Sequence, residues 1–207
     1  MKTVVVFDYG FGNVRSMVRA LADQGLDVTL TSDYRQALEA GAYGACMEGL
    51  RKVSGDRVIY DRLRADRPVL GVCVGEQIMF TEGEEHGVDT EGLGLIGGAV
   101  TRLDADVVPH MGWDTVQAPE GSILLNGVED ERFYFVHSYA ACDVTPADTS
   151  EYQIDFADAP ERVAWCTYGR SRFVAAYEHG PLFATQFHPE KSAQAGARLL
   201  RNWANVL

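Results

Sequence analysis

The opening of the chain constrains the fold more than any other feature, because strand and helix patterns alternate there. Residues 4–7 form a continuous apolar run that leads into a glycine-containing turn, which is typical of a buried strand. Val14, Val18 and Leu21 then recur at helical spacing, and residues 28–30 are predicted to form a second short strand. A strand–helix–strand opening predicts a parallel sheet with helices on its faces.

The rest of the chain first extends this pattern and then changes it. An apolar run at residues 69–72 leads into a segment typical of a helix start. From about Gly92 onward the predicted elements are short strands at 132–139, 163–168, 172–177 and 182–187, and an amphipathic helix at 193–204. We therefore expect a single α/β domain over residues 1–207, with a flavodoxin-like, largely parallel sheet, helices on both faces and an added antiparallel portion.

One segment disagrees with this strand count. Residues 33–44 lie between the second strand and a helix that begins near Ala45. Residues 35–40 have a helical pattern, and no apolar run follows them to supply a third strand. The predicted sheet is therefore one strand short, which would expose core side chains and backbone hydrogen-bonding groups.

The composition excludes several classes of function. The 207 residues carry a formal net charge of -12, which opposes binding to nucleic acid or to anionic lipid surfaces. No apolar run approaches the roughly 18 residues of a membrane span, and the N-terminal run is too short for a signal peptide, so we expect a cytoplasmic protein. No C-x-x-C or H-E-x-x-H motif supports a zinc site; the cysteines are Cys46, Cys73, Cys142 and Cys166.

Gly71-x-Cys73-x-Gly75 has the pattern of a nucleophile elbow, in which a strand turns sharply into a helix and exposes the side chain at the turn. The flanking glycines relieve crowding, and the N-terminus of the helix favours a thiolate. The backbone N–H of Val74 is placed to bind an oxyanion. The same short pattern also fits a buried cysteine in an ordinary turn, and these residues alone leave both interpretations open.

His188 and Glu190 supply the other groups that a thiolate nucleophile needs, a base and a residue that orients the base. They follow a predicted strand, and Pro189 between them prevents the segment from continuing as a regular strand. The two side chains can therefore converge on one cleft. Taken alone, a His-x-Glu pattern more often belongs to a polar surface loop.

Together, the segment around Cys73 (GVCVGEQ) and the segment around His188 (FHPE) resemble the paired signatures of the class I, triad-type glutamine amidotransferases. The resemblance implies that Cys73 attacks the side-chain amide of L-glutamine and that His188 passes a proton to the departing ammonia. It implies that Glu190 orients the imidazole and that Gln77 contacts the substrate. No cofactor or metal is needed for this thiolate chemistry.

Three further motifs resemble the glutaminase subunits of imidazole glycerol phosphate synthases, and this likeness runs over nearly the whole chain; they lie at residues 8–13, 109–113 and 134–139. The resemblance implies a heterodimer with a (β/α)8-barrel cyclase subunit, which receives the ammonia in histidine biosynthesis. The residues that it places near the partner contact and the ammonia exit are Pro109, His110, Met111, Trp113 and Asp114. The residues that it places along the glutamine site are His137, Ser138 and Tyr139.

Each of these motifs also has a structural alternative. Met111 and Trp113 could be ordinary core residues, and His137 could be a buried histidine whose nitrogens are satisfied by a neighbour. Residues 8–12 could be only a glycine turn, because the third glycine of a dinucleotide-binding fingerprint is missing. The joint match of all the motifs favours the amidotransferase interpretation.

The sequence departs from this family just before the helix at Ala45. The family has a strand and a Pro-Gly-Val-Gly-like loop there, and that loop supplies the second oxyanion donor, whereas Ala40 is followed directly by Gly41 here. We assign Gly41 to the oxyanion site. We expect the intact polypeptide to contain about eight more residues between Ala40 and Gly41, enough for a short strand and loop. A chain that truly lacks them would be a non-catalytic, regulatory partner subunit, and a stand-alone cysteine hydrolase is a further rival.

Two single residues also depart from the family pattern. Glu76 stands where the family usually has an apolar residue, and a carboxylate close to Cys73 would disfavour the thiolate. Asp114 stands where the family usually has asparagine, so it adds a charge to the predicted partner interface.

Overall fold

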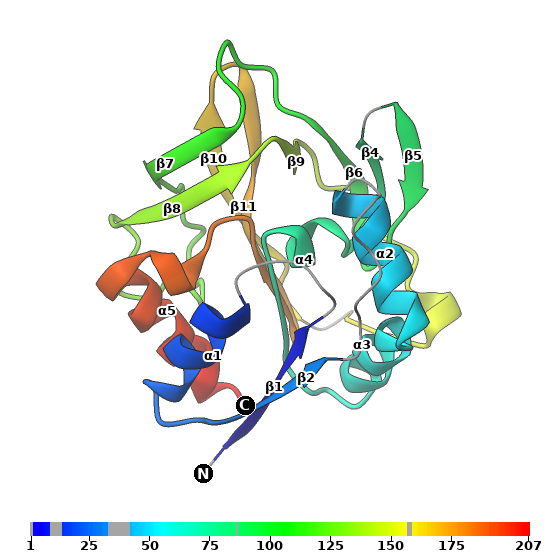
Figure 1. Cartoon of the computed structure of the whole chain (residues 1–207), viewed down its shortest axis with the longest axis vertical. Coiled ribbons are helices and arrows are strands. Elements are labelled where there is room, and N and C mark those ends of the chain that lie inside the picture. The colour runs from blue at the N-terminus through cyan, green and yellow to red at the C-terminus, as the bar shows by residue number, and fades with distance from the viewer. Residues whose placement is uncertain (1, 9–13, 33–41, 86, 157–158) are drawn as a thin grey trace.

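The computed structural model describes residues 2–8, 14–32, 42–85, 87–156 and 159–207 (Figure 1). The first elements are β1 (Thr3–Asp8), α1 (Val14–Ala22), β2 (Asp27–Ser32), α2 (Ala42–Lys52), α3 (Gly55–Arg64), β3 (Val69–Val72), α4 (Val74–Gln77), β4 (Phe80–Glu85), β5 (Val88–Glu91) and β6 (Ile96–Arg102). They are followed by β7 (His110–Thr115), β8 (Arg132–His137), β9 (Tyr139–Ala141), η1 (Ser150–Tyr152), β10 (Arg162–Tyr168), β11 (Ser171–His179), β12 (Leu182–Thr185), η2 (Pro189–Lys191) and α5 (Ala193–Asn205), where η denotes a 3-10 helix.

The predicted strand–helix–strand opening is confirmed. β1 and β2 pair in parallel, in a register that runs from Thr3 opposite Asp27 to Asp8 opposite Ser32. α1 contacts both strands and buries Leu21. Of the predicted apolar positions only Leu21 is buried, and Met17 and Ala20 pack against the same core beside it.

The central sheet has the strand order β10-β11-β12-β3 and is mixed. β3 runs parallel to β12, whereas β11 is antiparallel to both β10 and β12. A third sheet has the order β5-β4-β6-β9, and β7 pairs with β8. The structure is thus α/β, as predicted, with parallel pairing in β1–β2, β3–β12 and β4–β6 and antiparallel pairing in the other described ladders.

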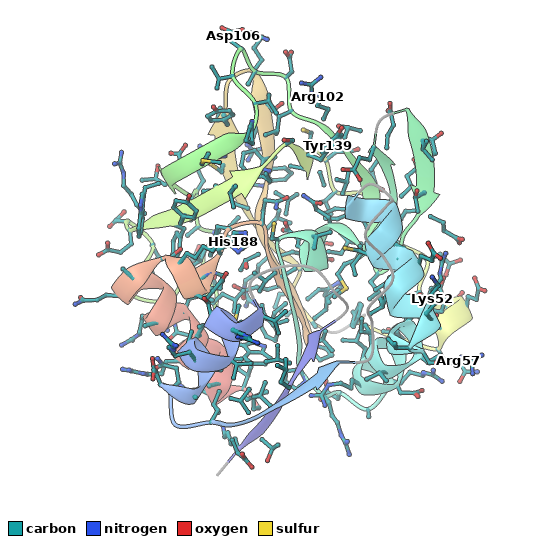
Figure 2. The ribbon with its side chains drawn as sticks, viewed as in Figure 1. Lys52, Arg57, Arg102, Asp106, Tyr139 and His188 are labelled. Carbon is teal, nitrogen blue, oxygen red and sulfur yellow. The ribbon has the colours of Figure 1, made fainter. Side chains whose placement is uncertain are left out.

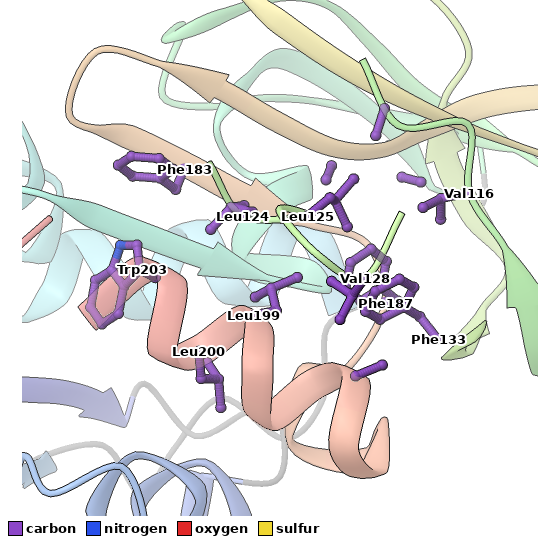
Figure 3. Packing of buried hydrophobic residues seen from close by; sticks show 14 of the residues in the cluster. Val116, Leu124, Leu125, Val128, Phe133, Phe183, Phe187, Leu199, Leu200 and Trp203 are labelled. Atoms are coloured by element: carbon purple, nitrogen blue, oxygen red, sulfur yellow. The ribbon is translucent and has the colours of Figure 1, made fainter. Parts of the chain in front are cut away.

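Two hydrophobic clusters lie on opposite faces of the central sheet, because successive residues of a strand point to opposite sides. In β12, Phe183 packs with Leu199 and Trp203 of α5 in the first cluster, which Figure 3 shows. Its neighbours Leu182 and Ala184 pack in the second cluster, together with residues of α2 and α3. Figure 1 shows the same division, with α1 and α5 on one side of the molecule and α2 and α3 on the other. In the described ranges, none of the helices combines the length and apolarity needed to cross a membrane.

The strand missing from the sequence count would lie where the described sheets are not joined. Within the described residues, β1 pairs only with β2, and β3 pairs only with β12. Val69, Leu70 and Val72 of β3 are half-buried, although the sequence predicts a fully buried strand. An unpaired strand edge leaves backbone groups and side chains that a neighbouring strand would cover.

Two helices differ from the sequence-based prediction. The helix expected after Cys73 has only the four residues Val74–Gln77, because the chain enters β4 at Phe80. α3 has no counterpart among the helices predicted from the sequence, and its buried residues are only Gly55 and Leu63. So sparse an apolar face gives no clear helical period.

Candidate active site

Two neighbouring strand ends bring the predicted nucleophile and base together. β3 and β12 are parallel, with Val72 opposite Thr185, so their carboxyl ends lie at one edge of the sheet. Cys73 follows β3 directly, and its N–H donates to the carbonyl oxygen of Thr185 at 2.7 Å. His188 follows shortly after β12. Open α/β sheets bind their ligands at this edge.

Cys73 has the strained backbone of a nucleophile elbow. Its φ is 55° and its ψ is -113°, a conformation that side-chain-bearing residues rarely adopt. Gly71 makes the turn possible, because a Cβ there would lie 2.4 Å from the carbonyl oxygen of Gly75. The N–H groups of Glu76 and Gln77 donate to the carbonyl oxygen of Cys73 at 2.9 and 3.1 Å and hold the turn closed.

The short α4 changes the predicted electrostatics of the elbow. The predicted helix start after Cys73 is present, but a helix of four residues has a smaller dipole than a longer helix, so it favours a thiolate less. What remains is local: the first N–H groups of the turn, including that of Val74, have no acceptor within their own helix. An oxyanion donor at Val74 is therefore still available from the geometry.

His188 is fixed by its neighbours. Its backbone N–H donates to the carbonyl oxygen of Tyr134 at 2.9 Å, and its carbonyl oxygen accepts from Oγ of Ser192 at 2.7 Å. Nδ1 donates to Oε1 of Glu190 at 2.8 Å, and the Glu190 side chain is only 2% exposed. Pro189 begins η2, whose turn brings the carboxylate back to the imidazole. Figure 2 shows His188 near the centre of the molecule.

The second ring nitrogen of His188, Nε2, is not bonded to Glu190 and is the one available to Cys73. Burial opposes protonation, but Cys73 and Glu190 outweigh it and raise the pKa of His188 to about 9. Nε2 is buried and has no hydrogen-bond partner in the part of the chain that the structure describes. The imidazole is thus held at Nδ1 by a carboxylate and interacts electrostatically with the thiol.

Two glutamine side chains complete the surroundings of the thiol. Nε2 of Gln77 donates to the carbonyl oxygen of Tyr139 at 2.8 Å and to Oε1 of Gln186 at 2.9 Å. Nε2 of Gln186 lies 3.7 Å from Sγ of Cys73. Gln77 is predicted from the sequence and Gln186 is not, although a polar residue inside the apolar run before His188 is a usable signal.

The stretch from His137 to Tyr139 lies against Gln77. Nδ1 of His137 donates to the carbonyl oxygen of Tyr139 at 2.9 Å, and its Nε2 lies 3.2 Å from Nδ1 of His110. Burial is the main reason why the pKa of His137 falls to about 3, so its imidazole is neutral at pH 7. The alternative of a buried, satisfied histidine therefore describes this side chain. Ser138 is half-buried, and its carbonyl oxygen accepts from the N–H of Leu103 at 3.0 Å.

Strand β7 carries the residues predicted for the partner interface, and they alternate between its faces. Pro109 precedes the strand and is exposed, whereas His110 is buried and stacks on Tyr168 with ring centroids 4.0 Å apart. Met111 is 62% exposed and Trp113 is 46% exposed. The alternative that these two are core residues is therefore wrong. Asp114 is partly exposed, with its carboxylate 3.5 Å from Nε2 of His110.

Glu76 is the least expected residue of the site. It is 1% exposed, and its Oε1 has no hydrogen-bond partner among the described residues. Burial and the neighbouring Cys73 raise the pKa of Glu76 well above its ordinary value. The predicted conflict with the thiolate is thus reduced, because a carboxyl group with a raised pKa is more often neutral.

Some sequence-based predictions fall outside the described residues. Gly41, the junction between Ala40 and Gly41, and most of the glycine motif at residues 8–13 belong to this group. In the ranges that are described, no group of three or more His, Cys, Asp or Glu side chains could hold a metal ion. A cavity of about 950 Å³ lies apart from Cys73, between residues 116–123 and the end of α5.

Comparison with known families agrees with this arrangement. A family model described as glutamine amidotransferase class-I matches residues 5–206. A solved structure described as glutamine amidotransferase has the same fold, with a TM-score of 0.67, 15% identity and coverage of 98% of each chain. The chain belongs to the class-I glutamine amidotransferase family.

Full-length relatives narrow the assignment within this family. A protein of Bifidobacterium longum named imidazole glycerol phosphate synthase subunit HisH is 72% identical, over 100% of both chains. A protein of the same name from Streptomyces avermitilis is 52% identical, over 100% of this chain and 97% of that protein. The chain therefore falls in the HisH branch. The first alignment runs over 215 residues, eight more than the 207 of this chain, so that relative has about eight positions without a counterpart here.

Proposed function

We propose that this chain is the glutaminase subunit of an imidazole glycerol phosphate synthase, which hydrolyses L-glutamine to L-glutamate and delivers the ammonia to a cyclase subunit. The observation that carries this proposal is the meeting of two strand ends, with Cys73 after β3 and His188 after β12. Oε1 of Glu190 accepts a hydrogen bond from Nδ1 of His188 at 2.8 Å. Nucleophile, base and orienting carboxylate therefore form one set.

The reaction follows from these positions. The sulfur of Cys73 attacks the side-chain amide carbon of glutamine, and the carbonyl electrons move to oxygen. The imidazolium of His188 gives its Nε2 proton to the amide nitrogen, which leaves as ammonia and a thioester remains. Neutral His188 then takes a proton from water, whose oxygen attacks the thioester, and the proton returns to the sulfur as glutamate leaves. Glu190 keeps Nε2 directed at the reacting atoms throughout.

Other residues have supporting roles in this proposal. The N–H of Val74 binds the oxyanion, and the second donor comes from the segment at Gly41. Gln77 contacts the substrate, and the stretch from His137 through Ser138 to Tyr139 borders the glutamine site. The chemistry uses neither a cofactor nor a metal.

The partner proposal rests on the exposed face of β7. Met111 and Trp113 place two large apolar side chains on one face, and a cluster of this kind is typical of an interaction site. We assign to this interface Pro109, His110, Met111, Trp113 and Asp114. The partner is a (β/α)8-barrel cyclase subunit, with which the chain forms a heterodimer. We also propose a single amidotransferase domain over residues 1–207, located in the cytoplasm, that binds neither nucleic acid nor membrane.

The test is a glutaminase assay with and without the cyclase subunit and its ligand. We expect little activity from the free chain, strong stimulation by the liganded partner, and none from Cys73→Ser. Equal activity with and without the partner would contradict the coupling. Absence of activity under both conditions would contradict the assignment as a glutaminase.

A second candidate is a regulatory subunit that binds the cyclase without hydrolysing glutamine. It is favoured by the edges of β1 and β3, which are not joined within the described residues, and by the roughly eight positions of the B. longum relative that have no counterpart here. Loss of one oxyanion donor costs about 2.7–4 kcal/mol in the transition state. The same assay separates the two, because a regulatory subunit would bind the cyclase and change its ammonia-dependent activity without forming glutamate.

A further inference from the structure

We propose that Gln186 is a further catalytic residue, whose side-chain N–H donates a hydrogen bond to the sulfur of Cys73 and stabilises the thiolate. Nε2 of Gln186 lies 3.7 Å from Sγ, within reach of a sulfur acceptor, and the residue is 0% exposed. The proposal rests on the proposed role of Cys73 as nucleophile. Gln186 would be an uncharged hydrogen-bond donor to the sulfur, beside the charged imidazolium of His188 in the proposed mechanism.

The carbonyl oxygen of Tyr139 determines which way the side-chain amides of Gln77 and Gln186 are oriented, because a carbonyl oxygen can only accept a hydrogen bond. It accepts from Nε2 of Gln77 at 2.8 Å and from Nδ1 of His137 at 2.9 Å. The Gln77 amide must therefore turn its nitrogen to this side. The same nitrogen then donates to Oε1 of Gln186 at 2.9 Å.

With its oxygen engaged by Gln77, the amide of Gln186 has its nitrogen free for Cys73. The reversed amide would place Oε1 against the thiolate, which repels it, and would place two N–H₂ groups against each other. The backbone is also fixed, since the N–H of Gln186 donates to the carbonyl oxygen of Ala175 at 2.9 Å. A buried donor of fixed orientation acts more strongly on a charge than an exposed one.

The test measures the reactivity of Cys73 rather than turnover. Wild type, Gln186→Met and Gln77→Met are treated with iodoacetamide at pH 7 and pH 9.5, and mass spectrometry follows alkylation of Cys73. Methionine keeps the length of the side chain but donates no hydrogen bond. Gln194→Met, on the exposed side of α5, is the matched control.

We expect Gln186→Met to slow alkylation about tenfold at pH 7, since a hydrogen bond to a charged group is worth about 1.5 kcal/mol or more. At pH 9.5, where free thiols are largely ionised, the rate should change less than about twofold. Gln77→Met should slow alkylation in the same pH-dependent way, because the Gln186 amide then loses the hydrogen bond that fixes its orientation. Gln194→Met should match wild type.

An unchanged rate at pH 7 in both variants would overturn the proposal. So would an equal loss at both pH values, because altered packing or access gives that result. Circular dichroism checks each fold, and Gln77→Met decides the question if Gln186→Met does not fold. If wild type fails to hydrolyse glutamine while the pH-dependent loss is still seen, the glutaminase assignment fails and the role of Gln186 stands.

Discussion

Nδ1 of His110 lies 3.2 Å from Nε2 of His137 inside the molecule, so the two buried imidazoles form one hydrogen-bonded pair. Nδ1–H of His137 already donates to the carbonyl oxygen of Tyr139, so its Nε2 accepts and His110 donates. Protonation of His137 at Nε2 would place its N–H group against the N–H group of His110, and the two would repel each other. Burial and this contact with His110 therefore both favour the neutral form of His137.

The pair predicts a loss of stability in acid. The pKa of His137 is about 3 in the folded state against 6.5 for the free side chain. A lowered pKa means that the stabilisation is present above pH 6.5 and is lost as the pH falls from 6.5 toward 3. Between pH 6.5 and pH 5 the free energy of unfolding should fall by about 1.5 kcal/mol through this group.

Urea unfolding of wild type and His137→Asn at both pH values measures this loss. The variant should lose less stability over the interval than wild type. His188 does not mask the effect, because its pKa is raised to about 9 and its stabilisation is lost only as the pH rises from 6.5 toward 9. The same acid loss in the variant and in wild type would contradict the assignment.

Glu76→Met should stabilise the protein at neutral and alkaline pH. The buried carboxyl has an oxygen without a partner among the described residues, and such a group costs about 1–3 kcal/mol. Its pKa is raised in the folded state, so the protonated form is favoured by folding, and stability is lost as the pH rises above the ordinary range of a glutamate.

The gain from Glu76→Met in urea unfolding should therefore be larger at pH 8 than at pH 5. Glu82→Met is the control, because Glu82 is an exposed residue of β4. A Glu76→Met variant that is no more stable than wild type at pH 8 would show that the carboxyl is well accommodated.

Completing the sheet should raise both stability and turnover. We predict this result for insertion of about eight residues, a short strand and loop, between Ala40 and Gly41. A strand there would join β1 to β3, and its loop would position the second oxyanion donor at Gly41, which is worth about 10²–10³ in kcat. A Gly-Ser insertion of equal length is the control. Equal stability and equal kcat for the two insertions would refute this account of the segment.

Trp113→Ala should weaken binding of the cyclase more than it weakens folding. Trp113 is 46% exposed, and its indole meets Tyr134 edge-on with ring centroids 6.0 Å apart, so a large part of its surface is available to a partner. Exposed tryptophans at interfaces often contribute about 2 kcal/mol, or roughly thirtyfold in Kd. Titration of glutaminase stimulation measures Kd, and Val88→Ala, an exposed apolar residue of β5, is the control. Equal effects of both substitutions on Kd would argue against β7 as the interface.

The positions of Cys73, His188 and Glu190 could be predicted because local motifs place them at the ends of two strands. Parallel pairing of β3 with β12 then brings them together, and the apolar runs already indicated both strands. The hydrogen-bond partners of Gln186 and of the His110–His137 pair could not be predicted in the same way. These hydrogen bonds join the residue after β12 to α4, and β7 to β8, so they depend on tertiary packing that a local pattern does not contain.

The central claim is that Cys73 is the nucleophile that attacks glutamine, and an electrophilic glutamine analogue tests it most directly. Burial raises the pKa of Cys46 and Cys166, and Cys142 is exposed but also has a raised pKa, so none of these three thiols is activated by its surroundings. Mass spectrometry of the labelled protein should find the analogue on Cys73 alone, and excess glutamine should slow the labelling. Labelling of Cys46, Cys142 or Cys166 before Cys73 would contradict the account.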